Sequence, residues 1–168
     1  MMLKILLPLT ISLSVLSAAM PAFAELILPG RCHMGRCWEH KFLKKTLLEK
    51  GRDGKLYAVE LAGRSWPTES KPPATFEPPQ TSYVYCSTTR PAYIFEIEGK
   101  NYAHLLNPGG DWFGYNVSDY PVYWATCHNV IGPDFFSKAM KSRATQLGYS
   151  MNLPSEQLEL NNVRDILK

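Results

Sequence analysis

The sequence predicts an α+β fold: a small antiparallel β-sheet or partly open barrel with two C-terminal helices, stapled by disulfides. Segments rich in β-branched and aromatic residues come first along the chain, and apolar residues at helical spacing appear only after Pro133. This order is typical of an antiparallel sheet with helices packed on one side or end. Four cysteines, an even number, follow residue 24 and favour two disulfides.

Residues 1–24 have the pattern of a signal peptide. Lys4 precedes an apolar run from Ile5 to about Ala19, and Ala22-Phe23-Ala24 forms a small-x-small cleavage site. We therefore expect a single exported domain over residues 25–168, periplasmic or secreted, in a bacterium. Since the apolar run is short for a membrane span, no stable membrane insertion is expected after cleavage.

The net charge argues against two classes of partner. The chain carries 18 Lys and Arg against 15 Asp and Glu, a formal charge of +3, and cleavage removes Lys4. A nucleic-acid binder needs a stronger positive balance, and so does a protein held at an anionic membrane surface. We expect neither partner.

The N-terminal half predicts a hairpin followed by a long loop. Residues 55–63 alternate like a strand and follow the turn signal from Gly51 to Gly54. The apolar residues of 37–50 neither gather on one helical face nor alternate cleanly, and a strand is the preferred interpretation. Residues 66–79 hold five prolines, which predicts an extended Pro-rich loop.

The middle of the chain predicts further strands over residues 82–87, 92–98 and 100–106, with a turn at Glu98-Gly99. The run 121–129 is also rich in β-branched and aromatic residues and is interpreted as a strand. Between these segments, 107–120 contains three glycines and is expected to be a loop.

Two helices are predicted at the C-terminus. Apolar residues from Phe135 to Leu147 recur at helical spacing, with Pro133 and Gly148 in boundary positions. A second helix is predicted from Pro154 to about Leu167.

The four cysteines allow three disulfide pairings. The glycine inside Cys32-His-Met-Gly-Arg-Cys37 eases a tight loop, which favours a Cys32–Cys37 bridge and leaves Cys86–Cys127 as a long one. The alternative is a metal site that adds His33 and His40 to the first pair. Its spacing does not match structural zinc sites, so no metal and no cofactor are expected.

The aromatic residues point to a candidate binding loop. Trp112, Phe113 and Tyr115 lie in a glycine-rich loop, where exposed aromatic side chains often serve recognition. In this interpretation they anchor a partner, and Asp111 and His104 supply polar contacts. The alternative is that the loop folds back and plugs the sheet.

Catalytic motifs give no support to an enzyme. The sequence lacks GxSxG, HExxH, P-loop and GxGxxG patterns. Cys127-His128 is interpreted as a disulfide cysteine beside a structural histidine, and Glu96 and Glu98 as the solvated face of a strand.

These observations predict a non-enzymatic exported binding module with a protein partner in the cell envelope, as an inhibitor, an immunity-type protector or an accessory factor. One alternative is a hydrolase of peptidoglycan or a similar polymer that uses His104, Asp111, Glu96 or His128. Another is a carrier of a small ligand or metal. The sequence leaves the oligomeric state open.

Overall fold

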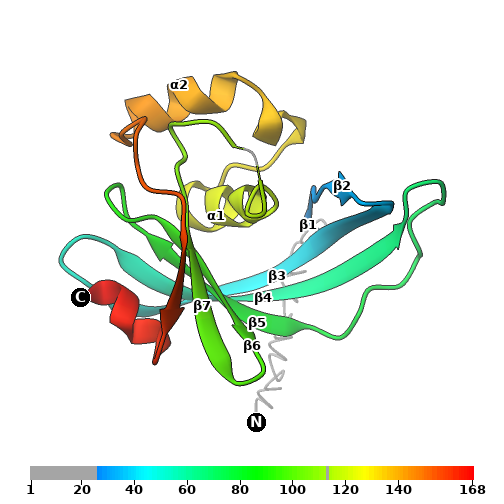
Figure 1. Cartoon of the computed structure of the whole chain (residues 1–168), viewed down its shortest axis with the longest axis horizontal. Helices are drawn as coiled ribbons and strands as arrows, with labels where there is room; N and C mark the ends of the chain where they lie inside the picture. The colour runs from blue at the N-terminus through cyan, green and yellow to red at the C-terminus, as the bar shows by residue number, and fades with distance from the viewer. Residues whose placement is uncertain (1–25, 113) are drawn as a thin grey trace, which may run out of the picture.

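The computed structural model describes residues 26–112 and 114–168. In these residues the chain forms one antiparallel sheet, with the order β1-β3-β4-β5-β6-β7-β8 and with β2 paired to β3 (Figure 1). The strands are β1 Leu26–Leu28, β2 Cys32–His33, β3 Arg36–Lys50, β4 Lys55–Pro67, β5 Gln80–Cys86, β6 Ala92–Ile97, β7 Lys100–Leu105 and β8 Gln157–Leu160. The predicted α+β class is therefore confirmed. Of the two predicted forms, sheet or partly open barrel, the structure is an open sheet.

The long β3–β4 hairpin confirms the predicted pairing across Gly51–Gly54. It also explains why the apolar residues of β3 do not alternate. The register shifts between Phe42 and Lys44 and again between Leu47 and Glu49, so Leu43 and Leu48 are bulged out of the ladder. Each bulge inserts one residue and resets the alternation of faces.

The outer side of β3 is a free edge of the sheet over much of its length. β1 pairs with β3 only from His40 to Phe42, and among the described strands β4 alone pairs with residues 44–50. Leu43 and Leu48 are both exposed along this edge.

Two α-helices follow the first seven strands: α1 Asp119–His128 and α2 Ala139–Gln146. Figure 1 shows α1 lying between the sheet and α2. The strand predicted over 121–129 is therefore wrong. Every residue of α1 from Tyr120 to Thr126 is buried. Since a helix buried all round has no polar face, its sequence lacks the helical period and resembles a buried strand.

The helix predicted from Pro154 is also wrong. The segment forms β8 and then a short 3₁₀ helix, η2 Val163–Leu167. β8 pairs with the otherwise free edge of β7, from His104↔Gln157 to Asn101↔Leu160. Pairing with β7 thus outweighs the helical spacing of apolar residues in this segment, because local helix preference determines the final structure only weakly. The earlier helical pattern divides into η1 Pro133–Phe136 and α2.

Apolar residues are buried on both faces of the sheet. One cluster joins Val59 and Val84 of the sheet to Tyr123 and Trp124 of α1. The other joins Ile94 of β6 to further sheet residues and to Ile166 of η2. The central strands are therefore covered on both faces.

Two disulfides confirm the predicted pairing. Cys32–Cys37 closes the small β2–β3 hairpin, and Cys86–Cys127 joins the end of β5 to α1. Such bridges are consistent with an extracellular or otherwise oxidising compartment. No helix among residues 26–112 and 114–168 has the length and apolarity that a bilayer span requires. The predicted signal peptide, residues 1–24, lies outside the described residues.

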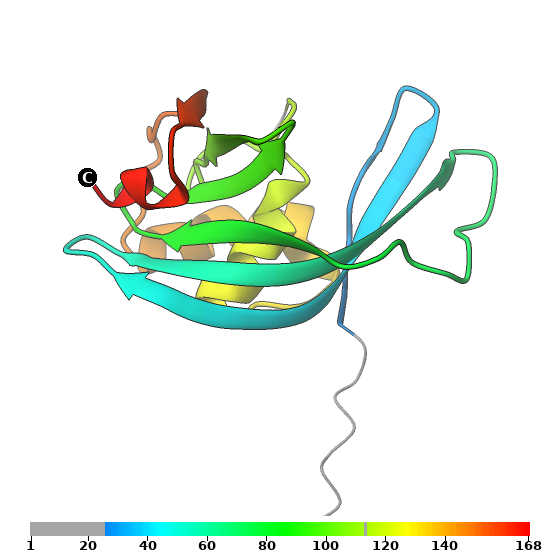
Figure 2. The same ribbon diagram turned by 90° about the horizontal axis from the view of Figure 1, so that it is seen from below.

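One end of the sheet projects from the body of the molecule. Figure 2 shows the β2–β3 hairpin, the end of β4 and the following loop extending away from the helices. β4 continues through Pro67, so the predicted Pro-rich loop begins at residue 68.

Candidate functional site

The glycine-rich loop between β7 and α1 uses its tryptophan for packing. The ring of Trp112 stacks on Tyr120 of α1 at a centroid distance of 4.4 Å, and its Nε1 donates to the Pro108 carbonyl oxygen at 3.1 Å. Trp112 is only partly exposed and contacts the core cluster beneath α1. Phe113 lies outside the described residues.

Asp111 and Tyr115 lie at the surface on a shared face. Asp111 forms an ion pair with Lys141 of α2. This pair lies between two adjoining grooves of about 260 and 580 Å³. Tyr115, Phe136 and Met151 are each about half exposed and line these grooves.

His104 is held from three directions. Its Nδ1 lies 2.6 Å from Oδ2 of Asp119, and its Nε2 lies 3.0 Å from Oε1 of Gln157. The ring also meets Tyr115 edge-on at 4.8 Å. Burial raises the pKa of Asp119, and its hydrogen bond to His104 opposes that rise. With both ring nitrogens engaged, His104 links β7 to α1 and β8.

The four residues of the hydrolase alternative lie apart. His104 is enclosed by Asp119 and Gln157, and Asp111 is paired with Lys141. Glu96 is exposed near the end of β6, and His128 lines a separate pocket at the end of α1. No pocket described among residues 26–112 and 114–168 is lined by two of these four residues, so their placement gives no support to an acid–base mechanism.

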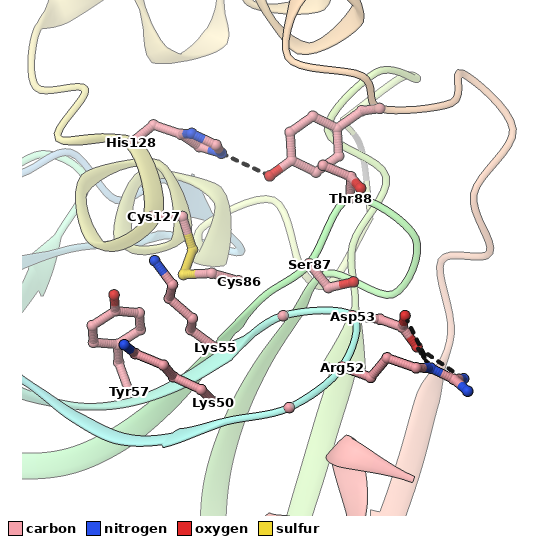
Figure 3. A pocket seen from close by; sticks show the side chains of 13 residues that line it. Lys50, Arg52, Asp53, Lys55, Tyr57, Cys86, Ser87, Thr88, Cys127 and His128 are labelled. Carbon is pink, nitrogen blue, oxygen red and sulfur yellow. Dashed lines mark hydrogen bonds and ion pairs between the residues drawn. A yellow bond between two sulfur atoms is a disulfide. The ribbon is translucent and has the colours of Figure 1, made fainter.

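The separate pocket has a volume of about 430 Å³ (Figure 3). Four parts of the chain line it: the β3–β4 hairpin around its turn, the end of β5 with the segment after it, the last turn of α1, and the segment after α2. Its lining residues are Lys50, Gly51, Arg52, Asp53, Gly54, Lys55, Tyr57, Cys86, Ser87, Thr88, Cys127, His128 and Tyr149.

Two links hold the end of α1 above this hairpin. The first is the Cys86–Cys127 disulfide. The second is Lys45 of β3, whose ammonium group donates to the carbonyl oxygen of Thr126 and to Oδ1 of Asn129, both at 2.8 Å. A cation at the carboxyl end of a helix is favoured because free carbonyl groups give that end a negative potential.

A directed chain of hydrogen bonds ends in the pocket. The hydroxyl of Tyr123 donates to the Ser87 carbonyl oxygen at 3.0 Å, and therefore accepts from the hydroxyl of Tyr149 at 2.7 Å. Because the hydroxyl proton of Tyr149 is used in that hydrogen bond, its oxygen accepts a hydrogen bond from Nε2 of His128 at 2.7 Å. This second bond is the dashed line from His128 in Figure 3. The direction of this bond assigns a proton to Nε2 of His128, and Nδ1 takes no part in the hydrogen-bond chain.

Burial keeps the side chains of this hydrogen-bond chain uncharged near neutral pH. It raises the pKa of Tyr149 to about 12 and that of Tyr123 well above its usual value. It lowers the pKa of His128 below 6.5. The end of α1 therefore presents a neutral imidazole to the pocket.

The opposite wall carries positive charge. Lys50 and Lys55 are cross-strand partners immediately before and after the turn, so both side chains leave the same face of the hairpin. Figure 3 shows them rising from the hairpin on the side of the disulfide. Among the described residues that line the pocket, Asp53 alone has a carboxylate, and it is paired with Arg52.

No family model, curated protein or solved structure matches this chain.

The sequence reasoning missed the pocket, although one signal was available. Neither Lys50 nor Lys55 was singled out from the sequence as a candidate binding residue. The predicted hairpin already placed Lys50 and Lys55 at matching positions around its turn, and matching positions share a face. The contribution of His128 could not be foreseen, because it depends on residues 121–128 being a helix.

The metal-carrier alternative gains no support. His33 lies in β2 and His40 in β3. In the described part of the chain, no three His, Cys, Asp or Glu side chains are grouped to hold a metal ion.

Proposed function

We propose that this chain is an exported, non-enzymatic binding module that docks a protein partner through one surface, here called the α2 face. The α2 face consists of Asp111, Tyr115, Phe136, Lys141 and Met151. The observation that carries the proposal is the gathering of three half-exposed apolar side chains around a single ion pair. Large apolar side chains beside grooves are typical anchors of protein interfaces.

The charges around this face indicate the chemistry of the partner. Lys138 and Lys141 line the smaller groove, and among the lining residues whose side chains are described Asp111 is the only acidic one. Because Asp111 already neutralises one of these lysines, the other ammonium group favours an acidic partner. We propose a partner segment with an apolar side chain flanked by carboxylates.

The experiment compares retention of envelope proteins on immobilised wild-type chain, on Tyr115→Ala/Met151→Ala and on a control. The control, Ile97→Ala, removes a side chain from β6 that is 52% exposed, comparable to the 50% of Tyr115. We expect at least one acidic protein to bind the wild type and the control. The double variant should bind it about tenfold more weakly, since anchors commonly contribute this much.

Retention of that protein should also fall with Lys138→Glu and with rising salt, since both weaken attraction between opposite charges. The proposal fails if every retained protein binds the double variant as well as the wild type. It fails equally if no protein binds the wild type above an immobilised unrelated control.

A further inference from the structure

The pocket of Figure 3 shares no lining residue with the grooves of the α2 face, and its chemistry points to a different ligand. Its most informative feature is the pair Lys50 and Lys55. Like charges directly opposite each other on neighbouring strands repel and destabilise the hairpin. Neither ammonium group has a hydrogen bond or an ion pair with any described residue.

The nearby carboxylate does not neutralise this pair. Asp53 lies within the turn, but its carboxylate receives hydrogen bonds from Arg52 at 3.2 and 3.3 Å. With Arg52 and Asp53 cancelling each other, two uncompensated positive charges remain in the lining. They lie at the edge of a cavity of about 430 Å³, a volume in the usual range for small-molecule sites.

The rest of the lining offers apolar and weakly polar surface. The phenol rings of Tyr57 and Tyr149 and the Cys86–Cys127 disulfide supply the apolar part. The His128 imidazole is neutral and fixed by its bond to Tyr149. Such a surface suits an organic body, and the lysines suit a charged oxygen-rich group.

We propose that this pocket binds a small organic anion: the Lys50 and Lys55 ammonium groups hold its oxyanion, of the phosphate or sulfate type, and Tyr57, Tyr149 and the disulfide contact its organic body. Binding relieves the repulsion between the lysines, because the anion supplies the missing negative charge. The site is independent of the α2 face.

The geometry of the pocket is set before any ligand arrives. Gly54 lies so close to β5 that an added Cβ would meet the Cys86 carbonyl oxygen at 2.5 Å and the Tyr85 ring at 2.8 Å. The turn is therefore pressed against β5, while the disulfide and Lys45 hold α1 opposite it. The backbone around the site is therefore formed in advance, and binding has to order only the exposed lysine side chains.

The test is calorimetric titration of the disulfide-bonded chain with phenyl phosphate, inorganic phosphate and phenol at low salt. We expect saturable binding of phenyl phosphate, weaker binding of inorganic phosphate and no binding of phenol. Lys50→Gln and Lys55→Gln should each weaken phenyl phosphate binding about tenfold, the usual scale for one charge-assisted contact.

The matched control is Lys44→Gln, which removes the same charge from β3, the strand that carries Lys50. Lys44 is paired with Glu60 and does not line the pocket. Binding to this control should change less than about twofold, since exposed pairs contribute little. The proposal is overturned if phenyl phosphate does not bind saturably, if phenol binds as well as phenyl phosphate, or if Lys50→Gln and Lys55→Gln bind no more weakly than the control.

A further arm separates a free organic anion from a lipid headgroup. Vesicles containing phosphatidic acid present the same phosphate at a membrane surface. We expect phenyl phosphate to bind the free chain, and the vesicles not to compete for it, because the pocket must enclose the organic body. Competition by the vesicles at matched phosphate concentration overturns the assignment to a small free anion.

Discussion

Among the single residues of the pocket, His128 is the one whose charge changes near neutral pH. Its imidazole is neutral there because burial lowers its pKa from 6.5. Tyr149, its hydrogen-bond partner, keeps its proton because burial raises the pKa of that hydroxyl to about 12. The other charged or titratable groups facing the pocket are Lys50, Arg52, Asp53, Lys55 and Tyr57, with Tyr123 behind Tyr149.

This arrangement predicts that anion binding strengthens as the pH falls. Below its pKa, His128 gains a proton on Nδ1 and adds a positive charge to the pocket, on the wall opposite the lysines. Phenyl sulfate is the suitable probe, because its single charge does not change over this range. We expect its affinity to rise from about pH 7.5 to about pH 5 in the wild type.

The control is His128→Gln, which retains a donor toward Tyr149 but cannot gain a charge. Its affinity for phenyl sulfate should stay constant across the same range. If the affinity of this variant rises at low pH as it does in the wild type, the role of His128 is contradicted.

In the ligand-free protein the same lowered pKa of His128 affects folding stability, which decreases as the pH falls. The unfolded chain takes up the proton first, so folded-state stability falls as the pH drops below 6.5.

Some of these residue roles were accessible from sequence and others were not. The disulfide role of Cys127 follows from counting cysteines in a chain that is expected to be exported. The partners of His104 could not be predicted, because Asp119 and Gln157 come from two elements whose secondary structure was assigned incorrectly. The position of a histidine in a predicted strand indicates which face of the sheet its side chain lies on. It does not indicate which later segments of the chain pack against that side chain.

At the scale of elements, the turn of the β3–β4 hairpin depends on the absence of a side chain at Gly54. We expect Gly54→Ala to destabilise the fold by about 1–3 kcal/mol, because the hairpin must move away from β5 to admit the methyl group. Gly63→Ala in β4 is the control, since the nearest neighbour of its added Cβ would be His40 at 3.9 Å. Urea unfolding of both variants checks the prediction, which equal midpoints would refute.

The elements also show which patterns a sequence can reveal. Strands β5 to β7 were predicted because they are rich in β-branched and aromatic residues, which fit a pleated surface, and because short turns separate them. β3 was harder, since Leu43 and Leu48 interrupt the alternation of faces along it. α1 was missed because its burial between the sheet and α2 removes the polar face that identifies a helix.

For the whole molecule, the long disulfide is the main covalent constraint. Cys86 and Cys127 are 41 residues apart, and Cys32 and Cys37 are 5 residues apart. In the chain-entropy treatment their loss costs about 4 and about 2 kcal/mol respectively. We therefore expect Cys86→Ala/Cys127→Ala to be the less stable variant.

Guanidinium unfolding of the two double variants under identical conditions measures this difference. Equal losses would contradict the prediction. Binding of phenyl phosphate gives an independent readout, because only the long bridge lines the pocket. Cys32→Ala/Cys37→Ala should retain the affinity of the wild type.

The fold class was predictable because it depends on the order of patterns along the chain, and the disulfide pairing because it depends on compartment and spacing. The α2 face was only partly predictable. Asp111 and Tyr115 were singled out from the loop, whereas Phe136 and Met151 join them through tertiary packing that no local pattern records.

The free outer edge of β3 affects whether copies of the protein associate at high concentration. An exposed strand edge is a template on which a second copy of a chain can add its own strand. Here Leu43 and Leu48 each interrupt the row of backbone donors and acceptors, and Lys44 and Lys50 place charges along it. An incoming strand would have to straighten both bulges before it could pair. The edge therefore protects the protein against edge-to-edge polymerisation at high concentration, although it exposes several leucines.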